Sequence, residues 1–199
     1  MTEAVMDTIR LDDIPIPDLS GVIDDTKAPS LEDGWYAGTI LEKRAFTDSN
    51  GNDRVFESGD TTSANGESRN IKLQVELTRQ SDQRTVNMNA LINYRGEDLT
   101  QETVQAVLAQ QERVKSKDEK NMGAYFRPFM TLQRLGTLQR IAGVRQLQRN
   151  GNGGLDLTPL FGKKAYFRIG PDTREGKSQY KQIETFSDAA PKGKKAVLL

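Results

Sequence analysis

Two runs of alternating apolar and polar residues between Asn70 and Asn93 constrain the fold more than any other feature of the sequence. The apolar residues are Ile71, Leu73, Val75 and Leu77 in the first run, and Val86, Met88, Ala90 and Ile92 in the second. Successive side chains of a β-strand point to opposite faces, so each run has one apolar and one polar face. The break at residues 79–83 is short enough for an antiparallel hairpin. The sequence therefore predicts a hairpin with one buried face and one polar face carrying Lys72, Asn87 and Asn89.

The composition limits the chemistry that this chain can perform. A chain of 199 residues can bury a hydrophobic core, but it contains no cysteine and no histidine. Disulfides, thiolate nucleophiles, the usual zinc sites and the commonest general base are therefore absent. No apolar run approaches the roughly 18–20 residues of a membrane span, and the N-terminus lacks the pattern of a signal peptide. We expect a cytoplasmic protein without membrane contact that is not an enzyme and holds neither a cofactor nor a metal.

Charge is distributed unevenly along a chain whose formal net charge is zero. Residues 1–33 carry nine acidic and two basic residues, a net charge of −7. Residues 113–149 carry nine basic and two acidic residues, a net charge of +7. This asymmetry favours a polyanionic partner with an acidic arm that imitates it, and the alternative is a solvated tail beside solvated helix faces.

Further elements follow from local patterns. We predict strands at 35–46, 163–169 and 179–186, and a long loop without structure of its own at 47–69. Thr100 is a suitable cap for a helix that runs to about Lys115. A second helical pattern lies within 124–148, where Pro128 fits only the first turn and Gly143 can end the helix.

The order of these elements predicts a mainly β fold with a helical insert between the third and fourth of five strands. That is the order of an OB-fold, a five-stranded, partly open Greek-key barrel, and a helix at 129–142 would cover its open end with Leu132, Leu135, Leu138 and Ile141. An unrelated β-sandwich with helices is the alternative. We divide the chain into an acidic arm (1–33), an OB-fold-like domain (34–187) with a helical insertion (98–148), and a basic tail (188–199).

The chain resembles phage-encoded single-stranded DNA-binding proteins of the OB-fold type over about residues 31–187. The segments that carry the resemblance are Leu31–Ile40, Ile71–Leu77, Leu132–Leu135, Ile141–Val144, Leu160–Lys163 and Tyr180–Phe186. The resemblance implies binding to single strands in DNA replication and recombination in the host cytoplasm, with protein partners recruited through the arm or the tail. Many such proteins end in an acidic tail, whereas this chain ends with Lys192, Lys194 and Lys195 and carries its acids at the N-terminus.

Binding to an unpaired strand requires cations along the phosphates and aromatic faces for the bases. An OB-fold binds on its second and third strands, between the first and last connecting loops. The residues that meet these requirements are Lys43, Arg44, Phe46, Arg54, Phe56, Arg69, Lys72, Asn87, Asn89, Arg168, Lys177, Tyr180 and Lys181. We interpret Trp35, Phe161, Phe167 and Phe186 as core residues, and Arg134, Arg140 and Arg145 as a solvated helix face.

Three classes of function remain open on the sequence alone. The first is nonspecific binding of single-stranded DNA, with RNA as an alternative ligand and a homo-oligomer as one assembly state. The second is a virion structural or assembly protein that uses the arm and the tail for contacts. The third, a Mg²⁺-dependent nuclease, is disfavoured because the acids near Asp172 and Glu175 lie too close together in one turn.

Overall fold

The structure is a computed structural model that describes residues 31–48, 50–79, 84–173 and 180–191. Eight strands lie within these ranges: β1 (Gly34–Leu41), β2 (Lys43–Thr47), β3 (Asp53–Glu57), β4 (Gly59–Thr62), β5 (Arg69–Thr78), β6 (Thr85–Tyr94), β7 (Lys164–Pro171) and β8 (Lys181–Ser187). Two α-helices, α1 (Gln101–Lys115) and α2 (Phe126–Ala142), follow β6, with short 3₁₀ turns at Gly96–Leu99, Gly123–Tyr125 and Thr158–Leu160. The predicted acidic arm and basic tail, except for their residues 31–33 and 188–191, lie outside the described residues.

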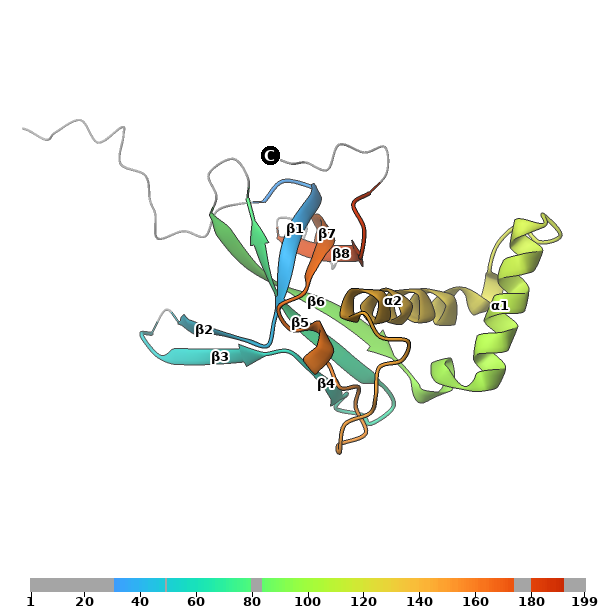
Figure 1. Ribbon diagram of the computed structural model, residues 1–199, viewed down its shortest axis with the longest axis horizontal. Helices are drawn as coiled ribbons and strands as arrows, with labels where there is room; N and C mark the ends of the chain where they lie inside the picture. The colour runs from blue at the N-terminus through green and yellow to red at the C-terminus, as the bar shows by residue number, and fades with distance from the viewer. Residues whose placement is uncertain (1–30, 49, 80–83, 174–179, 192–199) are drawn as a thin grey trace, which may run out of the picture.

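Strand β5 organises the main sheet. One edge of β5 pairs antiparallel with β6 along its whole length, from Arg69–Tyr94 to Thr78–Thr85. The other edge pairs first with β4 and then with β1, and the sheet continues through β7 to β8. Strands β2 and β3 form a separate two-stranded sheet that projects from the main body (Figure 1).

The predicted alternation is confirmed in the buried face of β5 and β6. Ile71, Leu73, Val75 and Leu77 are buried, as are Ala90 and Ile92. Leu135, Leu138 and Ile141 of α2 belong to the same core. In Figure 1, α2 lies beside β6 and β8, while α1 extends away from the sheet.

The helix boundaries follow the expected capping chemistry. The Thr100 hydroxyl oxygen accepts a hydrogen bond from the Thr103 amide (3.2 Å), and α1 ends at Lys115 as predicted. Pro128 lies in the first turn of α2, and Gly143 ends that helix at φ 74°, a conformation that glycine adopts without strain. Neither helix in the described part of the chain is long and apolar enough to cross a membrane.

Three structural predictions need correction. The segment 47–69 is not an unstructured loop, because it contains β3 and β4. The predicted strand 35–46 is divided at Glu42 into β1 and β2, which belong to different sheets. Trp35 is half-buried, and its neighbour Tyr36 occupies the core instead. The Tyr36 hydroxyl donates to the Glu32 carbonyl (3.0 Å), which satisfies the polar end of the ring.

The prediction of a mainly β fold with a helical insert is confirmed. The described strands form antiparallel sheets, and both helices lie between β6 and β7. No closed barrel is found, since no hydrogen-bonded ladder joins β6 to β8 in the described part of the sheet.

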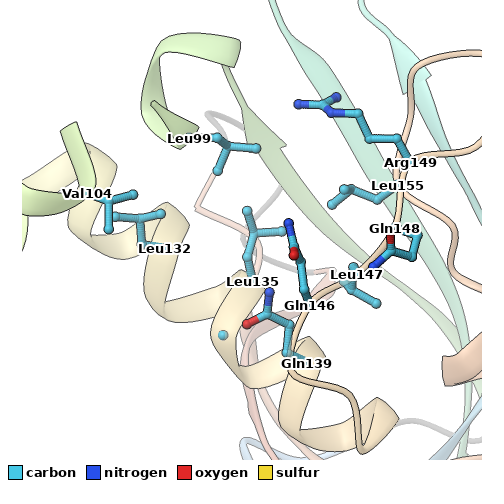
Figure 2. Close-up of a pocket in the computed structure, with 11 residues that line it drawn as sticks. Leu99, Val104, Leu132, Leu135, Gln139, Gln146, Leu147, Gln148, Arg149 and Leu155 are labelled. Atoms are coloured by element: carbon cyan, nitrogen blue, oxygen red, sulfur yellow. The ribbon is translucent and has the colours of Figure 1, made fainter. Parts of the chain in front are cut away.

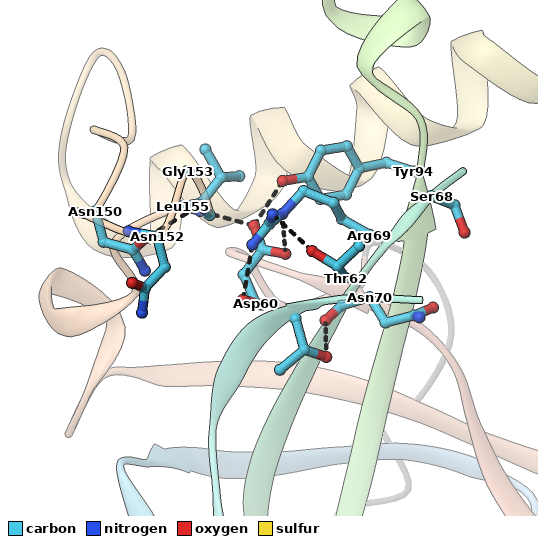
Figure 3. A network of polar contacts seen from close by, with 12 residues as sticks. Asp60, Thr62, Ser68, Arg69, Asn70, Tyr94, Asn150, Asn152, Gly153 and Leu155 are labelled. Atoms are coloured by element: carbon cyan, nitrogen blue, oxygen red, sulfur yellow. Dashed lines mark hydrogen bonds and ion pairs between the residues drawn. The ribbon is translucent and has the colours of Figure 1, made fainter. Parts of the chain in front are cut away.

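A buried carboxylate ties the start of the sheet to the chain that follows α2 (Figure 3). Asp60 on β4 accepts hydrogen bonds from the Tyr94 hydroxyl (2.5 Å), the Leu155 amide (2.7 Å) and Arg69 Nε (3.0 Å). Burial and the bond to Asp60 raise the pKa of the Tyr94 hydroxyl, so it remains a donor at neutral pH. We call Asp60, Arg69, Tyr94 and Leu155 the Asp60 network.

Removing the Asp60 carboxylate should strongly destabilise the fold. The substitution Asp60→Ala leaves the Tyr94 hydroxyl, Arg69 Nε and the Leu155 amide without their acceptor. We expect the free energy of unfolding, measured by urea denaturation, to fall by about 3–5 kcal/mol.

The matched control is Glu112→Ala, because Glu112 pairs with Lys115 on the solvent side of α1. Its expected loss is below about 0.5 kcal/mol. A second variant, Gly154→Ala, should also destabilise, since a Cβ there would lie 2.9 Å from the Asp60 carbonyl oxygen. If Asp60→Ala costs no more than Glu112→Ala, the structural role of the network is wrong.

Candidate nucleic-acid interface

The β2–β3 hairpin has two chemically different faces. The pairs Arg44–Phe56 and Phe46–Arg54 share one face because residues directly opposite in a ladder point the same way. The pairs Lys43–Glu57 and Ala45–Val55 lie on the other face. The hairpin therefore presents aromatic and guanidinium groups together on one side only.

Aromatic rings and cations stack on that face. The rings of Phe46 and Phe56 are parallel to within 14°, with centroids 4.8 Å apart. The Arg44 guanidinium carbon lies 5.5 Å from the Phe46 centroid and 5.3 Å from the Phe56 centroid. Lys72 Nζ, from β5, lies 4.6 Å from the Phe56 centroid. These separations are in the range of cation–π attraction, and we call Arg44, Phe46, Phe56 and Lys72 the hairpin cluster.

The hairpin cluster continues onto the polar face of the main sheet. Lys72 on β5 lies directly opposite Leu91 on β6, and Gln74 lies directly opposite Asn89. Asn87 and Asn89 are exposed on this same face, as the sequence predicts, and Lys72 is half-buried beneath the hairpin. Cations, aromatic rings and amides thus form one continuous surface from the hairpin to β6.

Two buried polar groups on this side of the sheet have no hydrogen-bond partner among the described residues. The side-chain amide of Gln74 is 1 % exposed, and neither its nitrogen nor its oxygen has a partner. Arg44 Nε is also buried and unpaired. A buried polar group without a partner costs free energy, and both groups are at or near the hairpin cluster: Arg44 belongs to it, and Gln74 lies two residues after Lys72.

The sequence did not predict that Gln74 is buried, because the alternation of apolar and polar residues in β5 places it on the polar face. No local signal in the sequence marks this position as buried. Ser58, which follows the hairpin, binds the backbone here: its hydroxyl donates to the Leu41 carbonyl (2.6 Å) and accepts from the Gln74 backbone N–H (2.8 Å).

Several predicted binding residues lie apart from the hairpin cluster. Arg69 is inside the Asp60 network, where its three guanidinium nitrogens donate to Asp60 and Thr62, so we remove it from the candidate interface. Lys43 is on the opposite face of the hairpin. Arg54 remains on the cluster's face, and its guanidinium is paired with Asp48 (3.0 Å).

The predicted residues of the last hairpin are engaged with other groups. Arg168 Nε pairs with Glu184 (3.1 Å), and Lys181 Nζ pairs with Asp33 (2.6 Å). Tyr180 is exposed at the start of β8. Lys177 lies outside the described residues. This region therefore supplies fewer unpaired cations than the sequence suggests.

The turn of the β2–β3 hairpin is fixed by Asp48. Its carboxylate accepts from the Asn52 amide (3.0 Å), from Arg54 Nε (3.0 Å) and from the Asn50 amide (2.9 Å). These hydrogen bonds hold the pKa of the Asp48 carboxyl below its ordinary value. The ionised Asp48 carboxylate thus stabilises the turn of a hairpin that has few buried apolar contacts of its own.

A separate cleft of about 620 Å³ lies between α2 and residues 146–149 (Figure 2). Its walls are mainly leucine and glutamine side chains: Leu99, Leu132, Leu135, Leu147, Leu155, Gln139, Gln146 and Gln148. Among the described residues, the charged side chain in its lining is that of Arg149, whose Nη1 donates to the Gly153 carbonyl (2.7 Å).

The described residues contain no cluster of three or more acidic side chains that could hold a metal ion. No protein-family model matches the sequence, and no curated protein is similar to it at a significant level. The candidate interface therefore depends on the geometry of the hairpin cluster and the polar face of β5 and β6.

Proposed function

We propose that this chain binds single-stranded DNA without sequence specificity, as a protein of DNA replication or recombination. The observation that carries the proposal is the hairpin cluster, in which two parallel aromatic rings lie beside Arg44 and Lys72 at the edge of an exposed amide face. Single-strand binding requires this combination of base stacking and phosphate neutralisation.

The strand order supports an OB-fold-like domain. The strands β6, β5, β1, β7 and β8 are neighbours in that order, and β6 and β8 lie close together although no ladder joins them within the described ranges. This is the neighbour relationship of the five strands of an OB-fold barrel, with β4 and the β2–β3 hairpin as additions to its first connection. In this arrangement the hairpin cluster occupies the first connecting loop, where OB-folds hold single strands.

The stacking geometry assigns different roles to the two rings. Both rings are half-buried. Phe56 lies beside Phe46, Arg44 and Lys72, whereas Phe46 lies beside Phe56 and Arg44 only, so Phe46 has fewer partners within the cluster. We therefore assign base stacking to Phe46, ring support to Phe56, and phosphate contact to Lys72.

The first test separates stacking from phosphate contact. Binding of a fluorescein-labelled 20-nucleotide oligo-dT is measured by anisotropy at several salt concentrations. Phe46→Ala should weaken binding by about 1–3 kcal/mol, the typical value of one stacked base, with the salt dependence unchanged. Lys72→Ala should weaken binding and reduce the slope of log K against log salt concentration by about 0.7, the value for one phosphate on a single strand.

The matched control is Val55→Ala, which shortens an exposed side chain on the opposite face of the same hairpin. It should bind oligo-dT like the unchanged protein. If the unchanged protein does not bind oligo-dT, or binds duplex DNA equally well, the proposed function is wrong. Salt-independent self-assembly without DNA binding would instead favour the virion-protein alternative.

The acidic residues of the first 30 positions provide a second prediction. If they compete with phosphates for the hairpin cluster, a chain that begins at Leu31 should bind oligo-dT more tightly at low salt. The difference should shrink as salt screens the competition. Equal salt titrations of the full and shortened chains would contradict competition by this segment.

A further inference from the structure

A hollow of about 410 Å³ lies between β6, β8 and α2, beyond the end of the hairpin cluster. Its lining comprises Asn89 and Leu91 from β6, Arg134 from α2, Thr173, and Gln182, Ile183 and Glu184 from β8. Leu91 connects the hollow to the cluster, because it lies directly opposite Lys72 in the β5–β6 ladder. The two sites are therefore adjacent on one face of the sheet.

The apolar part of the hollow is unusually exposed. Leu91 is 64 % exposed, although it lies in the middle of a strand whose neighbours on the other face are fully buried. Its side chain forms one wall, and Ile183 lines the same hollow from β8. Aliphatic surface of this kind suits the flat face of a heterocyclic ring.

The polar part of the hollow contains a donor without a partner. Arg134 Nη2 donates to the Glu184 carbonyl (3.3 Å), and this contact fixes the guanidinium against β8. Arg134 Nε is buried and has no hydrogen-bond partner among the described residues. Arg134, which we expected on a solvated helix face, is thus partly buried. The residue that carries this unpaired N–H also lines the hollow.

Acceptors accompany this donor. Glu184 is part of the lining, and its carboxylate lies beside Gly170 and is held by Arg168 Nε (3.1 Å). The Asn89 amide, which can both donate and accept, makes no hydrogen bond within the described part of the chain. The lining therefore combines an arginine, a glutamate and an asparagine with an aliphatic wall.

The geometry points to a nucleobase subsite in this hollow, which holds one base of the bound strand by its polar edge against Arg134 and Asn89, with the ring on Leu91. The inference rests on the proposed single-strand binding and extends it to a second, chemically different contact. A phosphate diester uses this lining less completely, because it offers acceptors only, whereas the Asn89 amide can both donate and accept. A base edge places donors and acceptors side by side, which matches the lining.

The test compares two ligands that differ only in their bases. Binding to a 20-nucleotide oligo-dT and to an abasic 20-mer with the same phosphates is measured by anisotropy, at low salt so that both bind. Arg134→Gln should weaken oligo-dT binding about fivefold or more, the lower end of the range for one base contact. It should leave the abasic affinity within about twofold and the salt slope unchanged, because no phosphate contact is lost.

The matched control is Arg145→Gln, which removes the same charge from an exposed residue beyond the end of α2. It should change neither affinity. Leu91→Thr provides a second variant that keeps the α2–β8 contact intact, and it should weaken oligo-dT binding selectively in the same way.

The outcomes separate the inference from the proposed function. Equal weakening of both ligands by Arg134→Gln, or no weakening by either variant, would overturn the base subsite while leaving single-strand binding in place. Failure of the unchanged protein to bind oligo-dT would remove the proposed function, and the subsite with it.

Discussion

The register between β5 and β6 is the constraint on which the rest of the structure depends. It places Ile71 opposite Ile92 on the buried face and Lys72 opposite Leu91 on the outer face. A slip of one residue would exchange the two faces completely, because side chains alternate with a period of two. The same register therefore determines the core and brings Lys72, Leu91 and Asn89 together on the outer face. The approach of β1 adds a second restriction, since a Cβ at Gly38 would lie 2.9 Å from the Glu76 carbonyl oxygen.

Strands and helix ends that are determined by neighbouring residues could be predicted from the sequence. Features that depend on a partner far along the chain could not. Apolar alternation locates β5 and β6, and Thr100 and Gly143 mark helix ends, because these signals lie within a few residues of their effect. Strands β3 and β4 were missed because their polar composition resembles a loop. Besides their backbone ladder, β2 and β3 are joined by the stacking of Phe46 on Phe56 and by the contact of Arg44 with Phe56 rather than by a buried apolar face.

The candidate interface shows the same division. Phe46, Phe56 and Lys72 were predicted from residue type, since aromatic residues beside cations in a polar segment satisfy the needs of single-strand binding. The environments of Arg69 and Arg134 could not be predicted correctly, because the burial and pairing of an arginine depend on partners far along the chain. Asp60 lies nine residues before Arg69 across a ladder, and the carbonyl of Glu184 lies fifty residues after Arg134.

The buried polar atoms without partners are concentrated on one side of the main sheet. Among the described residues, such atoms occur on Arg44, Gln74, Arg134 and Asp98. Asp98 Oδ1 still has an ionic partner, Arg127 Nη2, at 2.9 Å. The remaining three residues lie along the hairpin cluster, the polar face of β5 and the neighbouring hollow. Each unpaired group costs free energy in the folded protein, so these positions are places where the sheet is held at some expense of stability.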